Sequence, residues 1–414
     1  MEKIVLDKIE VKGNLIEYHY SVSEAIKHLF KTNVLYLEYE RDISSVPVSI
    51  LSIPFVAVMS GLSWLTDSAL FVDEIDRTYY NCYSRVKHAY QELHNDIQLK
   101  GVLIPSLFRD NSIDKSQNSL LLFGGGVDCH CSYLQNKDAV SHVCNINGWL
   151  DTPEVVDKVD EFDKKETEEF ASSRNLNPAH VRSNFAVQFD LDKINKAYQT
   201  NYWYSFLHSM AFISIAMPLC YIDGISNILI AASFTKDRAD LHCCSFVTTD
   251  SEVHFAENGN VTHDGFELGR HNKVRLLVEH QKSIGRPYPI HVCSFKDHNC
   301  CACEKCFRTI VAIVSEGGNP ADFGFPIEGN LLEHWQKIFH ERAGLWDLES
   351  EDSLAYYFTR QRMRENYDRI EYKDFVDWFL NLDVKKEKRD GLLRYVRKNF
   401  FSIIKRRLRS YLSK

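Results

Sequence analysis

Residues 120–129 read Leu120-Leu121-Leu122-Phe123-Gly124-Gly125-Gly126-Val127-Asp128-Cys129, an apolar run that breaks abruptly into three glycines. The run predicts a strand, the glycines predict a turn, and the residues behind them predict the start of a helix. Further apolar runs follow at 139–146, 185–189 and 227–232, and helix-like segments separate them. Strands that alternate with helices are typical of a parallel sheet covered on both faces. We therefore expect a doubly wound α/β domain.

The length of the chain leaves room for more than this domain. At about 150 residues per domain, 414 residues suggest two to three domains. Residues 1–112 mix strand-like and helix-like pieces, which predicts a small N-terminal α+β unit. We expect the α/β domain over 113–325, including a cysteine-rich segment near its end. Residues 326–414 are Trp-rich and helix-like, so we expect a helical C-terminal region that ends in a basic helix.

Composition and charge exclude several classes of protein. The chain has 49 Lys and Arg against 57 Asp and Glu, a formal charge of −8, which argues against specific nucleic-acid binding. Uncharged stretches at 44–66 and 201–222 are long enough to span a membrane, but their prolines and polar residues predict buried core helices. The first seven residues contain no apolar leader segment, so we expect a cytoplasmic protein. Its 12 cysteines are then thiols or metal ligands rather than disulfides.

Four cysteines form the densest cluster of chemistry. They are spaced C-x6-C-x2-C-x2-C, at Cys293, Cys300, Cys303 and Cys306. A two-residue gap lets a tight turn present two thiolates to one ion, and four thiolates complete tetrahedral Zn²⁺. Because such a site leaves no open position for water, we expect a structural zinc. An iron–sulfur cluster and a metal-free group of thiols are the alternatives, and Cys301 is expected to be a bystander.

The glycine turn predicts an anion site. Three glycines allow a ligand to approach the backbone N–H groups closely, and the helix N-terminus behind them adds positive potential that suits a phosphate. The turn is not a Walker loop, because no Gly-Lys-Ser/Thr follows, and the glycine spacing differs from that of a dinucleotide fingerprint. A purely structural glycine turn is the alternative interpretation.

Together these segments resemble a known family. Residues 123–129, Phe-Gly-Gly-Gly-Val-Asp-Cys, resemble the Ser-Gly-Gly-x-Asp-Ser loop of the PP-loop ATP pyrophosphatases, the adenine nucleotide alpha-hydrolase-like superfamily. The 7-cyano-7-deazaguanine synthases of that superfamily carry the loop at their first strand and four zinc-binding cysteines near the end of the domain, in the same order as here. Residues 304–309, Glu-Lys-Cys-Phe-Arg-Thr, are similar to a stretch in PP-loop relatives found with cell-surface polysaccharide and peptidoglycan genes.

The resemblance implies an ATP- and Mg²⁺-dependent enzyme. In that superfamily a substrate carboxylate attacks the α-phosphate of ATP, pyrophosphate leaves, and the acyl-adenylate reacts with ammonia or another nucleophile. Gly124 and Cys129 stand where the family has serines, and a glycine at 124 resembles the loop of the muramoyl-peptide glutamate epimerases. Asp128 is the implied catalytic acid, expected to help hold Mg²⁺. The implied nucleotide-binding loop consists of Gly124, Gly125, Gly126, Val127, Asp128 and Cys129.

Two other segments predict polar groups near this loop. Ser233 follows the apolar run 227–232, and an open sheet collects ligands at the C-termini of its strands. Lys236, three residues further on, would reach a phosphate. Glu267 and Arg270 lie three residues apart and would share one face of a helix with Asp264. We expect Glu267 and Arg270 to contact substrate or Mg²⁺ in catalysis; a solvated helix start is the alternative.

Three functions follow from these features. The favoured one is an AMP- and pyrophosphate-forming enzyme that activates a carboxylate, with ligase chemistry similar to that of the 7-cyano-7-deazaguanine synthases, in cell-surface polysaccharide or peptidoglycan metabolism. The alternatives are an ATP-dependent epimerase of a UDP-muramoyl-peptide glutamate and a non-catalytic nucleotide-binding module. The expected partners are ATP, a carboxylate-bearing small molecule and a second copy of the chain in a homodimer.

The C-terminal segment 392–412 predicts a basic amphipathic helix. Apolar residues recur there at spacings of three and four, beside a cluster of Lys405, Arg406, Arg407 and Arg409. Such a helix is able to rest weakly on an anionic membrane surface. A packed terminal helix with solvated charges is the alternative.

Overall fold

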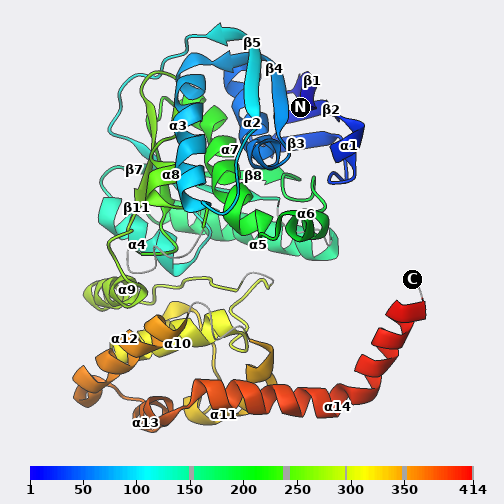
Figure 1. Ribbon diagram of the computed structural model, residues 1–414. Helices are drawn as coiled ribbons and strands as arrows, with labels where there is room; N and C mark the ends of the chain where they lie inside the picture. Colours follow the sequence, from blue (N-terminus) through cyan, green and yellow to red (C-terminus); the bar gives the residue numbers. More distant parts are fainter. Residues whose placement is uncertain (149–152, 236–242, 294–295, 347–351, 413–414) are drawn as a thin grey trace. The chain divides into compact units, whose positions relative to one another are not determined.

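The computed structural model describes residues 1–148, 153–235, 243–293, 296–346 and 352–412 (Figure 1). The chain divides into two compact units, Met1–Gly269 and Arg270–Lys414, which we describe separately. The first is an α/β unit built on one large sheet, and the second is helical.

The sheet of the first unit has eleven strands, most of them paired in parallel. Their order across the sheet is β10-β11-β9-β6-β7-β8-β3-β2-β1-β4-β5. The α/β class expected from the sequence is thereby confirmed. The strands are β1 (Glu2–Lys12), β2 (Leu15–Val22), β3 (Val34–Tyr39), β4 (Ser68–Asp76), β5 (Val102–Arg109), β6 (Ser119–Leu122), β7 (Val140–Asn147), β8 (Asn177–Ser183), β9 (Asn227–Ala231), β10 (His254–Phe255) and β11 (Gly259–Asp264).

The strand order reverses its direction beside β6. From β6 the chain moves outward to β7 and β8, then returns and adds β9 and β11 on the opposite side, and all these neighbours pair in parallel. In open α/β sheets, ligands bind outside the carboxyl ends of the strands at such a reversal. The glycine turn follows the carboxyl end of β6, so it occupies this position.

The N-terminal strands belong to the same sheet. β3 pairs antiparallel with β8, with Leu37 opposite Ser183, and β2, β1, β4 and β5 continue the sheet from there. The boundary expected at 112/113 therefore falls inside the first compact unit, and that expected at 325/326 falls inside the second. Residues 1–112 complete the sheet rather than forming a separate core, because β3 is hydrogen-bonded to β8.

Two long apolar helices fill the interior of the first unit. α2 (Val48–Leu65) and the helical stretch Trp203–Asp223, most of which is α7 (His208–Asp223), are long and apolar enough to cross a membrane, but both are mostly buried, as expected for core helices. Gly61 of α2 admits a close neighbour, since a β-carbon there would lie 2.8 Å from Cβ of Phe206. The other helices are α1 (Glu24–Lys27), α3 (Arg77–Leu93), α4 (Val127–Asn136), α5 (Pro153–Ser172), α6 (Leu191–Tyr198), the π-helical turn η1 (Trp203–Leu207) and α8 (Val247–Asp250).

The second unit is built around the apolar face of α10. The ring of Phe307 on this helix lies 4.8 Å from that of Trp335 and 4.6 Å from that of Phe339, centroid to centroid. Because these partners come from the following helices, the cysteine segment before α10 belongs to the helical unit and not to the α/β domain. The elements are α9 (Arg270–Ile284), α10 (Glu304–Ser315), η3 (Pro320–Phe323), α11 (Leu331–Arg342), η4 (Ala343–Leu345), α12 (Asp352–Glu365), η5 (Tyr367–Arg369), α13 (Lys373–Asn381) and α14 (Val384–Leu412).

Candidate functional site

The glycine turn forms a backbone cradle between β6 and α4. Gly125 has φ +68°, a left-handed conformation that favours glycine. Gly126 is the N-cap of α4 and offers no side chain to cap the first turn. A β-carbon at Gly124 would meet nothing within 4 Å. The N–H groups of a helix start are polarised positively and need partners, so the geometry suits an anion.

Hydrogen bonds hold the cradle in place. The backbone N–H of Phe123 donates to the carbonyl of Cys144 at 2.8 Å, and the side-chain amide of Asn145 donates to the carbonyl of Phe123 at 3.1 Å. The thiol of Cys129 donates to the carbonyl of Gly126 at 3.2 Å. Burial raises the pKa of Cys129 to about 12, so it stays a neutral thiol. Its hydrogen bond to Gly126 stabilises the loop.

A carboxylate that the sequence did not indicate lies against the cradle. A β-carbon at Gly125 would be 2.5 Å from Oε2 of Glu166 on α5. Phe170, one turn further along the same face of α5, packs on Phe123 with ring centroids 4.3 Å apart and so fixes the helix there. Burial, together with the nearby Asp163 and Glu169, raises the pKa of Glu166 to about 8. Gly125 is thus required both for its φ angle and for the space that Glu166 occupies.

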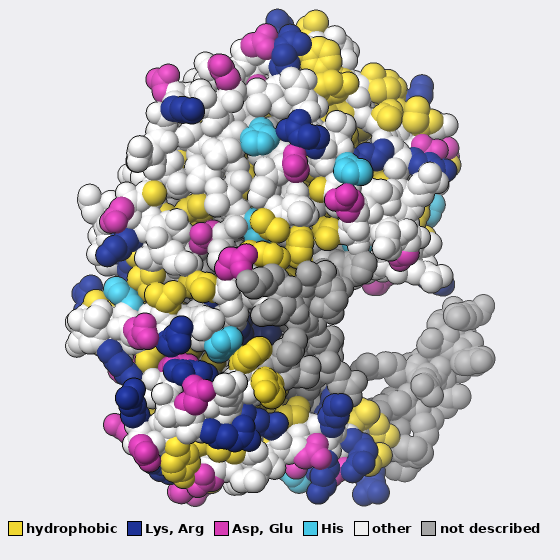
Figure 2. All heavy atoms as spheres, turned by 60° about the vertical axis from the view of Figure 1, so that its left-hand side comes forward, with side chains coloured by type: hydrophobic (Ala, Val, Ile, Leu, Met, Phe, Trp, Pro, Cys, Tyr) yellow, Lys and Arg dark blue, Asp and Glu magenta, His cyan; other side chains and the backbone are white. Residues whose placement is uncertain are grey.

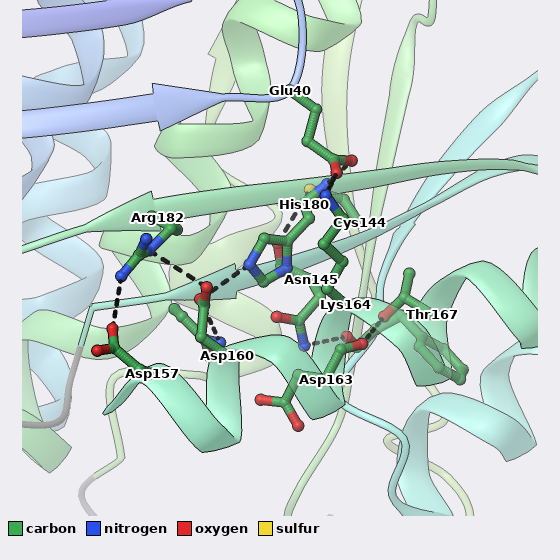
Figure 3. A network of polar contacts seen from close by, with 12 residues as sticks. Glu40, Cys144, Asn145, Asp157, Asp160, Asp163, Lys164, Thr167, His180 and Arg182 are labelled. Carbon is green, nitrogen blue, oxygen red and sulfur yellow. Dashed lines mark hydrogen bonds and ion pairs between the residues drawn. The ribbon is translucent and has the colours of Figure 1, made fainter. Parts of the chain in front are cut away.

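A polar network continues from α5 to the ends of β7 and β8 (Figure 3). Asp160 accepts from the ring Nε2 of His180 at 2.9 Å and from the amide of Asn147 at 3.0 Å, and it pairs with Nε of Arg182 at 3.2 Å. Although burial opposes its ionisation, the hydrogen bonds from His180 and Asn147 hold the pKa of Asp160 below its usual value. Arg182 also pairs with Asp157 at 3.1 Å. Asp157 and Asp160 of α5 are thus paired with basic side chains of β8.

The other predicted residues are distributed over several elements. Ser233 is exposed and follows the carboxyl end of β9, as expected, whereas Lys236 lies outside the described residues. Asp264 ends β11 and accepts a hydrogen bond from Ser132 of α4.

The expected helix face shared by Asp264, Glu267 and Arg270 does not occur. Asp264 is in a strand, Glu267 is in the turn after it, and Arg270 begins α9 in the second unit. There Nη2 of Arg270 donates to Thr309 of α10 at 3.1 Å. The strand extends through Asp264, and Gly265, with φ +79°, then breaks the run that the sequence suggested as helical.

The four predicted cysteine ligands come together in the helical unit. The Sγ atoms of Cys293, Cys300, Cys303 and Cys306, which we call the four-cysteine group, lie within 4.8 Å of one another. Cys303 is the N-cap of α10 and accepts from the N–H of Cys306 at 3.5 Å. The thiol of Cys301 instead donates to the carbonyl of Asn299 at 3.5 Å, outside the group. The four-cysteine group could hold a metal ion such as zinc.

The electrostatics of the four-cysteine group favour a cation. Hydrogen bonds from Cys303 and Cys306 lower the pKa of Cys300, while the hydrogen bond to Cys300 raises that of Cys303 to about 11. The neighbouring thiols therefore favour a thiolate at Cys300. A divalent ion would change this balance, because it stabilises every ligand as a thiolate.

A second pair of thiols, Cys243 and Cys244, lies in the first unit. Sγ of Cys244 is 3.2 Å from Nδ1 of His208. Hydrogen bonds from Cys244 and His208 lower the pKa of the neighbouring Cys243 to about 5, against the effect of burial. Cys243 and Cys244 are not members of the four-cysteine group.

No family model matches the chain, and neither a curated protein nor a solved structure does.

Proposed function

We propose that the protein binds ATP at the glycine turn and uses it to activate a substrate carboxylate as an adenylate, in the manner of the PP-loop superfamily. The observation that carries the proposal is the position of Gly124–Gly126. They form an uncapped helix start at the carboxyl end of β6, where the strand order reverses. Both the geometry and the place in the sheet are typical of nucleotide sites.

The residues around the cradle support the chemistry. The N–H groups of the turn and of the first turn of α4 would hold the phosphates that leave as pyrophosphate. Ser233, which follows β9, is proposed to contact them, and so is Lys236. Asp128 is in the first turn of α4 and, with Glu267, is proposed to contact Mg²⁺ and substrate. Bound Mg²⁺ supplies charge neutralisation of the leaving group.

Isotope exchange between pyrophosphate and ATP tests the function. The purified chain, supplied with Mg²⁺ and a panel of carboxylic acids, should exchange labelled pyrophosphate into ATP only with acids that it adenylates. Inversion of a peptide-bound glutamate, with AMP formed, would favour the epimerase. ATP binding without exchange for any acid would favour a non-catalytic nucleotide module.

We also propose that the four-cysteine group holds structural zinc. Four thiolates match the tetrahedral preference of zinc and leave no position for water. Support comes from the convergence of the four sulfur atoms at the N-terminus of α10, whose apolar face organises the helical unit.

The basic end of the chain is proposed to contact anionic membranes. α14 has eleven Lys and Arg against two acidic residues, a formal charge of +9 in a chain whose total is −8. Its Leu392 and Leu393 are 47% and 50% exposed. Figure 2 shows Lys and Arg side chains beside hydrophobic ones on the helical unit. Exposed leucines together with basic charge suit a lipid surface better than a nucleic acid.

Vesicle flotation checks this membrane contact. The full-length protein should float with vesicles that contain anionic lipid, less so at high salt, and Leu393→Asp should abolish flotation. Leu107→Asp is the matched control, because Leu107 of β5 is 49% exposed but lies outside α14. Equal flotation of the wild type and Leu393→Asp would assign α14 to internal packing.

A further inference from the structure

The acids of α5 form a row with two different ends. Asp157, Asp160, Asp163 and Glu166 follow one another at intervals of three, so each is the neighbour of the next on the helix surface. The first two pair with Arg182 and, for Asp160, with His180. The last two lie toward the glycine turn, where carboxylate oxygens of Asp163 and Glu166 are within 4.8 Å of each other.

Two carboxylates this close, in a mostly buried place, are costly to ionise. Burial raises the pKa of Asp163 to about 6, and burial together with Asp163 raises that of Glu166 to about 8. Like charges at such a distance disfavour double ionisation unless a cation lies between them. The structure thus holds a pair of hard oxygen ligands side by side.

An independent observation indicates a ligand at the same place. Asn145 at the end of β7 is 5% exposed, and its Oδ1 has no hydrogen-bond partner among the described residues. Its amide nitrogen is already used by the carbonyl of Phe123, so the oxygen is held in position. Figure 3 shows the amide of Asn145 between the ring of His180 and the carboxylate of Asp163. Amide and carboxylate oxygens together are a ligand set that Mg²⁺ accepts.

Glu166 links these ligands to the proposed nucleotide site. Oε2 of Glu166 lies 2.5 Å from the position that a β-carbon of Gly125 would take, directly against the cradle. Phosphates held by the turn would meet this carboxylate, and two anions in contact repel. A divalent cation between them would convert the repulsion into attraction from both sides.

We propose that Asp163, Glu166 and the amide oxygen of Asn145 bind a Mg²⁺ ion that bridges α5 to phosphates on the glycine turn. The proposal rests on the proposed function. Glu166 would then make nucleotide binding dependent on Mg²⁺. The principal metal ligands would lie on α5 and β7, and Asp128 would contribute less.

Mn²⁺ is the probe, because its free ion is counted by electron paramagnetic resonance. The zinc-loaded full-length protein should bind Mn²⁺ without nucleotide and bind it more tightly with ATP. Glu166→Gln and Asp163→Asn should each weaken Mn²⁺ binding at least about tenfold. Glu168→Gln is the matched control, since Glu168 is exposed on the same helix and should leave Mn²⁺ binding unchanged. Circular dichroism of each variant checks that the fold is kept.

ATP affinity with and without metal completes the test. With a chelator present, the affinity of the wild type for ATP should fall at least about tenfold. In Glu166→Gln the chelator should lower ATP affinity less, because the carboxylate that repels the phosphates is gone. Mn²⁺ binding that is equal in the wild type, Glu166→Gln and Asp163→Asn would overturn the cation site. Loss of Mn²⁺ in these variants, with no ATP binding by any protein, would support the cation site and overturn the proposed function.

Discussion

Cys303→Ser should remove the metal and destabilise the helical unit, the largest effect on stability that we expect. Cys303 supplies one of four converging sulfur atoms and also caps α10. Loss of a structural metal is one of the few changes that lower the free energy of unfolding by more than about 4 kcal/mol. Elemental analysis should give one zinc per wild-type chain and less than one in the variant, and thermal unfolding should show the loss of stability.

Cys301→Ser is the control for this variant. Its thiol bonds the carbonyl of Asn299 outside the metal group, and a serine hydroxyl is able to replace that bond. Zinc content and melting temperature should stay near those of the wild type. Iron in place of zinc, no metal at all, or a Cys303→Ser protein that keeps its zinc would contradict the structural-zinc proposal.

Gly125→Val should abolish ATP binding, the largest effect expected on function. The valine side chain would occupy the space beside Glu166 and block access of phosphate to the backbone N–H groups. Because φ is +68° at this residue, the substitution also costs about 1–2 kcal/mol in backbone strain. Calorimetric titration with ATP and Mg²⁺ measures the loss of binding.

Gly124→Ala separates ligand exclusion from strain. A β-carbon at Gly124 meets nothing within 4 Å and φ is not positive there, so the fold should be unaffected while ATP binding weakens. If both variants bind ATP as tightly as the wild type, the nucleotide site is elsewhere and the PP-loop proposal fails.

The features that the sequence predicted are local ones. The strand, glycine turn and helix start of 120–129 appear as β6, the cradle and α4, because each is set by residues within one short stretch. The four cysteines likewise converge as their two-residue spacing predicts. In both places the chemistry depends on backbone turns that neighbouring residues determine.

The features that the sequence did not predict depend on distant contacts. Glu166 reaches Gly125 only because Phe170 packs on Phe123, a pairing that no local periodicity encodes. The pairing of β3 with β8 joins residues that are distant in the sequence, such as Leu37 and Ser183. Local patterns do not reveal such a pairing, and the sequence therefore predicts a separate N-terminal unit. The single sequence signal for the α5 site was the three-residue spacing of its acids.

Hydrogen–deuterium exchange of backbone amides with and without ATP and Mg²⁺ tests the central claim most directly. The N–H groups of an uncapped helix start exchange readily until a ligand accepts their hydrogen bonds. We predict that ATP slows exchange most strongly at residues 124–129, and that Gly125→Val removes this protection. Protection by ATP at another segment, with 124–129 exchanging as fast as in the free protein, would contradict the claim.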